Sequence, residues 1–402
     1  ALGWGETSDY LDSRRFVEPM FVFVIMVIAA SRPVMQLARD TVAFAAARLP
    51  LERPLAVYFV SLALVPLLGS FITEPAAMTL AALMLRDTVF TRAASARLRY
   101  ATLGVLFVNV SIGGTLTNFA APPVLMVAAQ WDWSTAHIFA TLGWKALAAV
   151  LINSALVTFV FRRQLAGQRA AAAGDRAGRV PRAFVAVNLA ILALVVLASH
   201  DPEVFMGLFL IFLGLAEAYR RHQDRLMLRE GLMVAFFLAG LVVLGGQQKW
   251  WLQDVLVNLD DSALFFGAAA LTAITDNAAL TYLGSLVGGV SEDFKYALVA
   301  GAVAGGGLTV IANAPNPAGF AILKDRFEDR SINAFGLLAA ALPPTCIAIA
   351  CLWGLSGHIG DAFDVAAWQA WLASVDREFA FLLVLPLVVA AVGLWAVRRE
   401  HE

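Results

Sequence analysis

Long apolar stretches recur along the whole chain and limit what it can fold into. Their typical length, about 17–25 residues, is what an α-helix needs to cross a hydrocarbon layer about 30 Å thick. The composition agrees, because 60% of the 402 residues are hydrophobic and the mean hydropathy is +0.75, whereas soluble domains are about 45–50% apolar. We predict an all-α polytopic membrane protein embedded in the lipid bilayer. The apolar stretches lie at 17–31, 55–85, 98–128, 137–161, 183–199, 203–219, 231–247, 262–287, 294–323, 333–356 and 379–397.

Simple counts and motifs argue against several other classes of protein. The net charge of −1 gives no reason to expect a nucleic-acid partner. Cys346 and Cys351 lie five positions apart in one apolar segment, which fits neither a disulfide framework nor the spacing of a metal site. The catalytic patterns His-Glu-x-x-His and Gly-x-Ser-x-Gly are absent from the sequence. We therefore expect a protein that is not an enzyme and needs no cofactor.

The distribution of basic residues predicts the orientation of the loops. Arginines cluster in 86–99, 162–182 and 220–229, and such clusters mark the cytoplasmic side of membrane proteins. The other loops are poorer in basic residues and often acidic, so we place them outside. Three further assignments follow from composition: interfacial amphipathic helices at 34–49 and 249–259, a cytoplasmic basic linker plus connecting helix pair at 162–230, and a last transmembrane helix at 379–397.

Two of the apolar stretches do not fit a single crossing of the membrane. Segment 262–287 has outside-type loops at both ends, so we expect a re-entrant hairpin whose two arms of about 13 residues each reach about 20 Å into the membrane. Segment 55–85 is flanked by Arg48, Arg53 and Arg86, which indicates a hairpin that enters from the cytoplasm. Such a tip is tolerated in the membrane only where protein or a water-filled cavity surrounds it.

The two predicted hairpins resemble each other in sequence. "FITEPAAMTLAAL" aligns with "AITDNAALTYLGS" at an offset of 202, and further on "GTLTNFAAPPV" aligns with "GGLTVIANAPN" at an offset of 192. The glycines and prolines of the second pair indicate helices broken within 98–128 and 294–323. We predict two repeats, 17–161 and 231–356, which the charge pattern places in opposite orientations, as in secondary transporters.

The acid at each hairpin tip is the leading candidate for chemistry. Asp276 lies between Thr275 and Asn277, and a carboxylate at the membrane centre must be protonated, paired with a cation or hydrated. All three states suit a site that exchanges a proton for a cation. The alternative is that Asp276 only caps a helix, since Asp and Thr are good N-caps. Glu74 is the symmetric candidate, and its alternative role is to cap the following arm or to pair with a basic group.

Neutral oxygen ligands and one basic residue complete the predicted site. A hard cation such as Na⁺ prefers oxygen ligands, and we expect Na⁺ at Asp276, Asn277 and Asn313. Lys145, which lies within an apolar stretch, could neutralise an empty carboxylate or extend toward the membrane surface. The other polar residues predicted to bind ions at the tips and the helix breaks are Thr275, Glu74, Thr73, Thr117, Asn118, Thr309 and Asn316.

The second predicted repeat also carries a family resemblance. "ALTAITDNAALTYLGSLVGG" and "YALVAGAVAGGGLTVIANAPNPAGFAILK" resemble the bacterial Na⁺/H⁺ antiporters of the ion transporter superfamily, which also holds the NhaD-type antiporters, the arsenite permeases and the divalent anion/sodium symporters. The resemblance is strongest over 231–345. It implies inverted repeats with re-entrant hairpins and broken helices, a homodimer in the bacterial inner membrane, and binding of cation and proton by Asp276 and Asn277.

The sequence thus predicts a secondary transporter that exchanges Na⁺ for protons by alternating access. The alternative is an anion transporter of the same superfamily, for arsenite or a small organic acid. The resemblance argues against dicarboxylates, because the symporters that carry them have Ser-Asn-Thr at both tips, where this chain has Thr-Glu-Pro and Thr-Asp-Asn. Added negative charge at the tips would repel such a substrate.

Overall fold

The computed structural model describes residues 3–91, 94–166, 179–327 and 330–355, and within these ranges every regular element is a helix. Four helical spans are long and apolar enough to cross a membrane, or five if one bent pair is counted as a span. This confirms the predicted membrane-protein character. The predicted helix 379–397 and part of the linker, 167–178, lie outside the described residues. The four spans are Arg53–Ile72, Thr135–Val160, Leu228–Gln253 and Ala334–Leu352.

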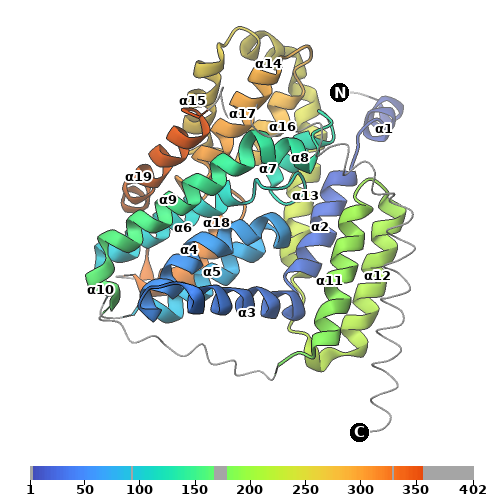
Figure 1. The fold of residues 1–402 in the computed structure, drawn as a ribbon. Helices are drawn as coiled ribbons and strands as arrows, with labels where there is room; N and C mark the ends of the chain where they lie inside the picture. The colour runs from blue at the N-terminus through green and yellow to red at the C-terminus, as the bar shows by residue number, and fades with distance from the viewer. Residues whose placement is uncertain (1–2, 92–93, 167–178, 328–329, 356–402) are drawn as a thin grey trace.

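The N-terminal part of the chain forms α1 (Trp4–Asp12) and then the bent pair α2 (Val17–Ala29) and α3 (Arg32–Arg48). The two helices of the pair meet at 65°. Pro33 lies in the first turn of α3, where its missing N–H costs no helical hydrogen bond. In Figure 1, α3 crosses the lower edge of the molecule, where it packs against α4.

The first predicted hairpin and broken helix correspond to four helices. The chain turns sharply between α4 (Arg53–Ile72) and α5 (Glu74–Thr88), which pack along each other. Next, α6 (Ala96–Gly113) begins at Ser95, whose hydroxyl accepts a hydrogen bond from the Leu98 N–H at 3.2 Å. Residues 114–121 are not helical, and the chain resumes as α7 (Pro122–Ala128). The remaining helices of this half are α8 (Thr135–Ile138), the π-helical turn Phe139–Gly143, α9 (Trp144–Val160) and α10 (Arg162–Ala166).

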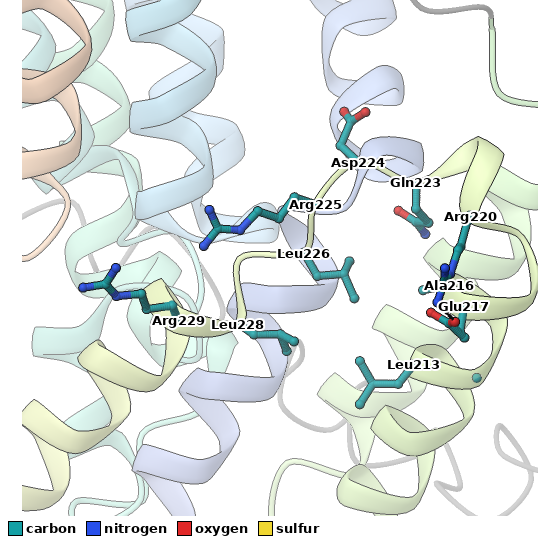
Figure 2. A pocket seen from close by; sticks show the side chains of 11 residues that line it. Leu213, Ala216, Glu217, Arg220, Gln223, Asp224, Arg225, Leu226, Leu228 and Arg229 are labelled. Carbon is teal, nitrogen blue, oxygen red and sulfur yellow. Dashed lines mark hydrogen bonds and ion pairs between the residues drawn. The ribbon is translucent and has the colours of Figure 1, made fainter.

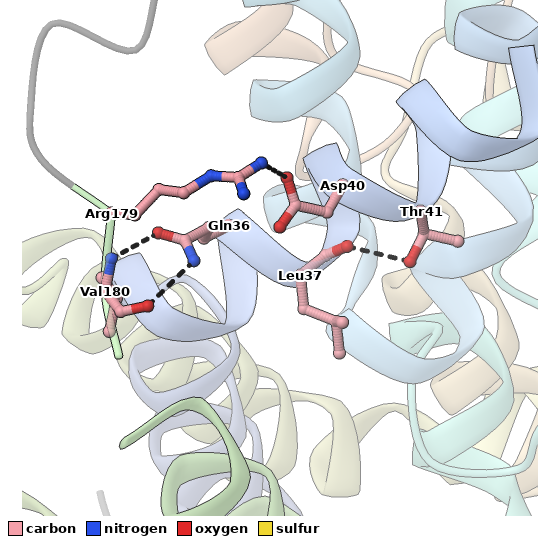
Figure 3. A network of polar contacts seen from close by, with 6 residues as sticks. All are labelled: Gln36, Leu37, Asp40, Thr41, Arg179 and Val180. Atoms are coloured by element: carbon pink, nitrogen blue, oxygen red, sulfur yellow. Dashed lines mark hydrogen bonds and ion pairs between the residues drawn. The ribbon is translucent and has the colours of Figure 1, made fainter. Parts of the chain in front are cut away.

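Two connecting helices follow, α11 (Arg182–Leu197) and α12 (Pro202–Ala218), as predicted. They contact each other and both contact α2, and in Figure 1 they form the right-hand edge of the molecule. The segment before α11 is anchored on α3 (Figure 3). There the Gln36 amide accepts from the Val180 N–H at 2.8 Å and donates to the Val180 carbonyl at 3.2 Å, while Arg179 pairs with Asp40 at 3.4 Å.

The second half begins with a longer helix than predicted. The apolar stretch at 231–247 and the amphipathic piece at 249–259 are joined, because α13 (Leu228–Gly245) continues through the 3₁₀ turn Gly246–Gln248 into α14 (Lys249–Leu256). The following helices are α15 (Asp261–Thr272), α16 (Asn277–Ser285), α17 (Glu292–Gly305), α18 (Asn316–Leu323) and α19 (Ala334–Leu352).

The second pair of arms differs from the first in its packing. α15 makes only slight contact with α16 and packs along α17 instead. The reason lies in two glycines of α17: methyl groups on Gly301 and Gly305 would lie 2.3 and 2.2 Å from the carbonyl oxygens of Phe265 and Ala269. Small residues spaced four apart let two helix backbones approach closely in a membrane protein.

The two halves of the chain also pack across each other. α5 of the first half contacts α18 of the second, and α16 of the second half contacts α7 of the first. α5 and α16 each follow a tip. Each of them contacts the short helix, α18 or α7, that follows the unwound segment of the other half. This exchange of partners places both tips near the middle of the interface between the halves.

Candidate functional site

The first tip is a strained and buried turn. Thr73, between α4 and α5, has a φ of 70°, a region that β-branched residues rarely adopt. Its side chain is 2% exposed, that of Glu74 is 0% exposed, and Pro75 continues the first turn of α5. Strain of this kind persists only where the surrounding structure enforces it, and it is concentrated at functional sites. Neither Thr73 Oγ1 nor Glu74 Oε1 has a hydrogen-bond partner in the described part of the chain.

The Glu74 carboxylate is held by residues that are distant in sequence. Its Oε2 accepts a hydrogen bond from Asn313 Nδ2 at 2.9 Å. Its Oε1 lies against Gly114, at the beginning of the first unwound segment, where a methyl group would be only 2.4 Å from the oxygen. A glycine at 114 therefore leaves room for the carboxylate in this position. Oε2 is bonded to the second half, and Oε1 is buried against the first half.

The second tip has Asn277, with its amide side chain, at the position where the first tip has Pro75. Asp276 is half-buried and caps α16, since its Oδ1 accepts from the N–H groups of Ala278 and Ala279 at 2.9 and 3.1 Å. Asn277 is 0% exposed, and its backbone N–H donates to the Ala312 carbonyl at 3.0 Å. Neither Oδ1 nor Nδ2 of Asn277 has a partner among the described residues. The Thr275 hydroxyl donates to the Leu271 carbonyl at 2.9 Å.

The second unwound segment, 306–315, joins the two tips. Ala312 accepts from the second tip, and the next residue, Asn313, donates to the first. Asn316 closes the segment with bonds of 2.8 Å to the carbonyls of Gly306 and Thr309. The Oδ1 atoms of Asn313 and Asn316 are both buried and lack partners in the described structure. The prediction that Asn313 and Asn316 bind an ion stays a prediction, and the sequence did not show that one segment contacts both tips.

Gly306 marks the place where the second tip meets the first half. A methyl group there would lie 2.1 Å from Ser111 Oγ and 2.7 Å from Asn277 Nδ2. Ser111, in α6, also donates to the Val303 carbonyl of α17 at 2.8 Å. Sequence reasoning missed Ser111, although a serine followed by the break after Gly113 is the kind of polar position that flanks an unwound helix.

Three of the predicted ligands form hydrogen bonds that link the unwound segments to other parts of the chain. Thr117 donates to the Ser70 carbonyl at 2.7 Å, and Thr309 donates to the Ala273 carbonyl at 2.8 Å. Each hydroxyl thus ties an unwound segment to the arm before a tip of its own half. Asn118 is engaged elsewhere, with its Nδ2 on the Trp133 carbonyl at 2.9 Å and its Oδ1 on the Thr135 hydroxyl at 2.7 Å.

Lys145 is buried but lies against an aromatic residue rather than a carboxylate. Its Nζ donates to the Tyr296 hydroxyl at 2.9 Å and lies 4.3 Å from the centre of that ring. Tyr296 in turn donates to the Leu352 carbonyl. Across the described ranges Lys145 forms no ion pair, so its role as a charge partner of the tips stays a prediction.

A second buried polar network was not predicted from the sequence. Asn109 in α6 donates to Leu62 O at 2.9 Å and to Ser154 Oγ at 3.0 Å, and its Oδ1 accepts from Asn153 Nδ2 at 2.9 Å. This network joins α4, α6 and α9. The signal was present as single asparagines within apolar stretches, which are expensive in a membrane unless they are paired.

The chemistry at the tips favours a small hard cation or a proton. Buried polar atoms are normally hydrogen-bonded, yet the tips and segment 306–315 gather oxygens from Thr73, Glu74, Asn277, Asn313 and Asn316 that lack partners in the described part of the chain. One carboxylate with neutral oxygens is the donor set of a hard cation. Among the described residues no group of three His, Cys, Asp or Glu side chains is suited to a metal.

A cavity at some distance along the chain is separate from this site. It has a volume of about 890 Å³ and lies between the end of α12, the segment 223–226 and the start of α13 (Figure 2). In Figure 2, the side chains of Arg225 and Arg229 extend away from Leu213 and Glu217. None of the tip residues lines this cavity.

Comparison with known proteins adds one finding. Residues 1–355 match the model of a protein family described as "Putative Na+/H+ antiporter". No curated protein matches the chain. The description is that of a transporter rather than an enzyme, and it fits the apolar spans of the fold.

Proposed function

The chain belongs to this family of Na⁺/H⁺ antiporters, and from that premise we propose that it exchanges Na⁺ for H⁺ by alternating access, with ion and proton bound in turn at the hairpin tips. The observation that carries the proposal is the meeting of both tips at segment 306–315, through the Asn277–Ala312 and Glu74–Asn313 hydrogen bonds. A site between two tips and an unwound segment is the arrangement from which secondary transporters bind ions.

The burial of a carboxylate couples the binding of Na⁺ to the release of a proton. Glu74 is 0% exposed, and an isolated charge in such surroundings is strongly disfavoured unless it is neutralised. A proton and a Na⁺ ion each neutralise the carboxylate, but they compete for the same oxygen. The site therefore releases one when it binds the other, which is the requirement for exchange without a leak of either ion.

The packing across the halves supports a movement that opens the site to one side at a time. α5 packs against α18, and α16 against α7, so we expect these helices and both tips to move together as one unit. The inverted orientation of the halves and the re-entry of the hairpins are part of this proposal. The homodimer implied by the family resemblance also stays a prediction.

The tip residues do not favour an anion as substrate. The side chains gathered there are carboxylates, amides and hydroxyls, whereas Lys145 donates to Tyr296. An anion would need a positively charged partner or several aligned hydrogen-bond donors, whereas the second tip carries the carboxylate Asp276. These residues therefore disfavour the arsenite or organic-acid alternative.

Purified protein in liposomes would test the proposed function. With an acidic interior and a pH-sensitive dye inside, addition of external Na⁺ should raise the internal pH in protein-containing vesicles, and addition of choline chloride should not. Protein-free liposomes are the control. Uptake of labelled arsenite or carboxylate without any Na⁺-driven proton movement would overturn the proposal.

A further inference from the structure

Each tip acid has one oxygen that accepts hydrogen bonds within the described structure and one that does not, but Glu74 is 0% exposed whereas Asp276 is half-buried. Asp276 Oδ1 accepts two backbone N–H groups at the start of α16, which is the ordinary structural role of an N-cap aspartate. Glu74 has one oxygen on Asn313 and one without a partner in the described structure. We propose that Glu74, rather than Asp276, is the carboxylate that binds proton and Na⁺ in turn, and that Asp276 is a positioning residue for Asn277.

The surroundings of Glu74 supply the other ligands of a dehydrated cation. Thr73 Oγ1 is adjacent in the chain, and Asn313 Oδ1 belongs to the amide whose nitrogen already binds Glu74. These atoms are buried, are oxygens, and lack partners among the described residues. Three protein oxygens with one negative charge form a partial shell of the kind that Na⁺ takes from carbonyls, hydroxyls and carboxylates.

Gly114 leaves room for the Glu74 carboxylate. A methyl group at 114 would lie 2.4 Å from Glu74 Oε1 and 2.7 Å from Glu74 Cγ, so the glycine lets the carboxylate occupy this buried position. Asn313 holds the opposite oxygen, Oε2. The unpaired oxygen is therefore held in place for an incoming proton or cation.

The role of Asp276 follows from its place in the second tip. Capping fixes the first turn of α16, and Asn277 is the first residue of that turn. The cap thereby sets the position of the Asn277 amide, which lies beside Gly306. An asparagine at 276 offers the same oxygen to the two N–H groups, so the charge of Asp276 is not needed for this role.

The inference rests on the proposed function, and a set of matched variants separates the two. Na⁺-driven proton movement is measured in liposomes for wild type, Glu74→Gln and Asp276→Asn, together with the proton released when Na⁺ is added to each detergent-purified protein. We expect Glu74→Gln to lower exchange about 100-fold or more, as expected when one partner of a buried charge interaction is removed, and to abolish proton release. We expect Asp276→Asn to keep both within about threefold, since the cap survives.

The outcomes are distinct. If wild type shows no Na⁺-driven proton movement, the proposed function fails. If wild type exchanges and Glu74→Gln keeps exchange, or Asp276→Asn loses it, the assignment to Glu74 alone is wrong. Should Glu74→Gln fail to fold, Gly114→Ala replaces it, because its methyl group crowds Oε1 without removing the charge. A raised KM for Na⁺ with unchanged kcat is then expected, and an unchanged KM overturns the inference.

Discussion

The two tips share a Thr-acid pair but differ in nearly everything around it. At the first tip, α4 and α5 pack together, Thr73 is strained, and Glu74 is completely buried. At the second, α15 is drawn away to α17, and Asp276 is half-buried as a cap. The same short pattern therefore carries two kinds of chemistry, and the residues beyond the pattern decide which.

The difference extends to the residues that align between the halves. At the positions aligned with Asn277, Asn313 and Asn316, the first half has Pro75, Ala121 and Val124. The first half thus supplies a fully buried carboxylate, and the second supplies buried amides. A site built this way depends on both halves, although they were predicted to be copies of one plan.

The largest effect is expected at Asn313, where the first half has alanine at the aligned position, Ala121. Asn313→Ala removes the donor to Glu74 Oε2, and a buried group left unsatisfied costs about 1–3 kcal/mol. We expect Na⁺-driven proton exchange to fall about 10- to 100-fold, since about 1.4 kcal/mol is a factor of ten. The matched control is Asn118→Ala, whose amide binds Trp133 and Thr135 instead. Equal losses in both variants would contradict the division.

Crowding the meeting point of the halves should destabilise the protein. In Gly306→Ala the new methyl group would lie 2.1 Å from Ser111 Oγ, and overpacking of this kind costs about 1–3 kcal/mol. Thermal unfolding in detergent would measure the loss. Gly240→Ala in α13 is the control, because nothing lies within 4 Å of a methyl group there, and an unchanged or higher Tm is expected. A stable Gly306→Ala protein would mean that α6 and α17 are less closely packed than described.

A smaller effect is expected from the cap of the second tip. Asp276→Ala removes the acceptor for two N–H groups, and loss of a cap costs about 1 kcal/mol. Asp276→Asn should cost little, because an amide oxygen also caps. Unfolding by heat or denaturant would compare the two. Equal destabilisation by Asn and Ala would show that charge, rather than capping, is what α16 needs.

Two further small effects should be alike in the two halves. Thr117→Val and Thr309→Val each remove one bond from an unwound segment to the arm before the tip of its own half, and each should cost about 0.5–1.5 kcal/mol. The double variant should show the sum, since the two sites have no shared partner. A much larger loss in one half would show that the two fastenings are not equivalent.

Local features could be predicted from the sequence because local chemistry determines them. Gly113, Pro122 and the glycines of 305–307 lie at helix ends, where such residues are favoured, and the breaks in α6–α7 and α17–α18 fell within the predicted ranges. Glycines 301 and 305 act only through α15, and their effect on the second pair of arms was missed. The joining of α13 to α14 was missed too, because the mixed polarity of 249–259 indicated a separate interfacial helix.

The partners at the site could not be predicted because they join distant parts of the chain. Glu74 and Asn313 are 239 positions apart, and no pattern near either residue identifies the other. The alignment of the repeats pointed to the second acid first, since Asp276 lies beside an asparagine that looks like a ligand. Whether a carboxylate caps a helix or remains unpaired depends on the backbone around it.

The exchange of partners between the halves has a consequence for how the protein is made. When the ribosome has completed only the first half, α5 has no α18 to pack against, and Glu74 lacks Asn313 as its hydrogen-bond donor. Membrane proteins are inserted while they are synthesised, and domains synthesised first tend to fold first. The nascent first half therefore lies in the bilayer without these contacts, and we expect the Glu74 carboxyl to be protonated until the second half arrives.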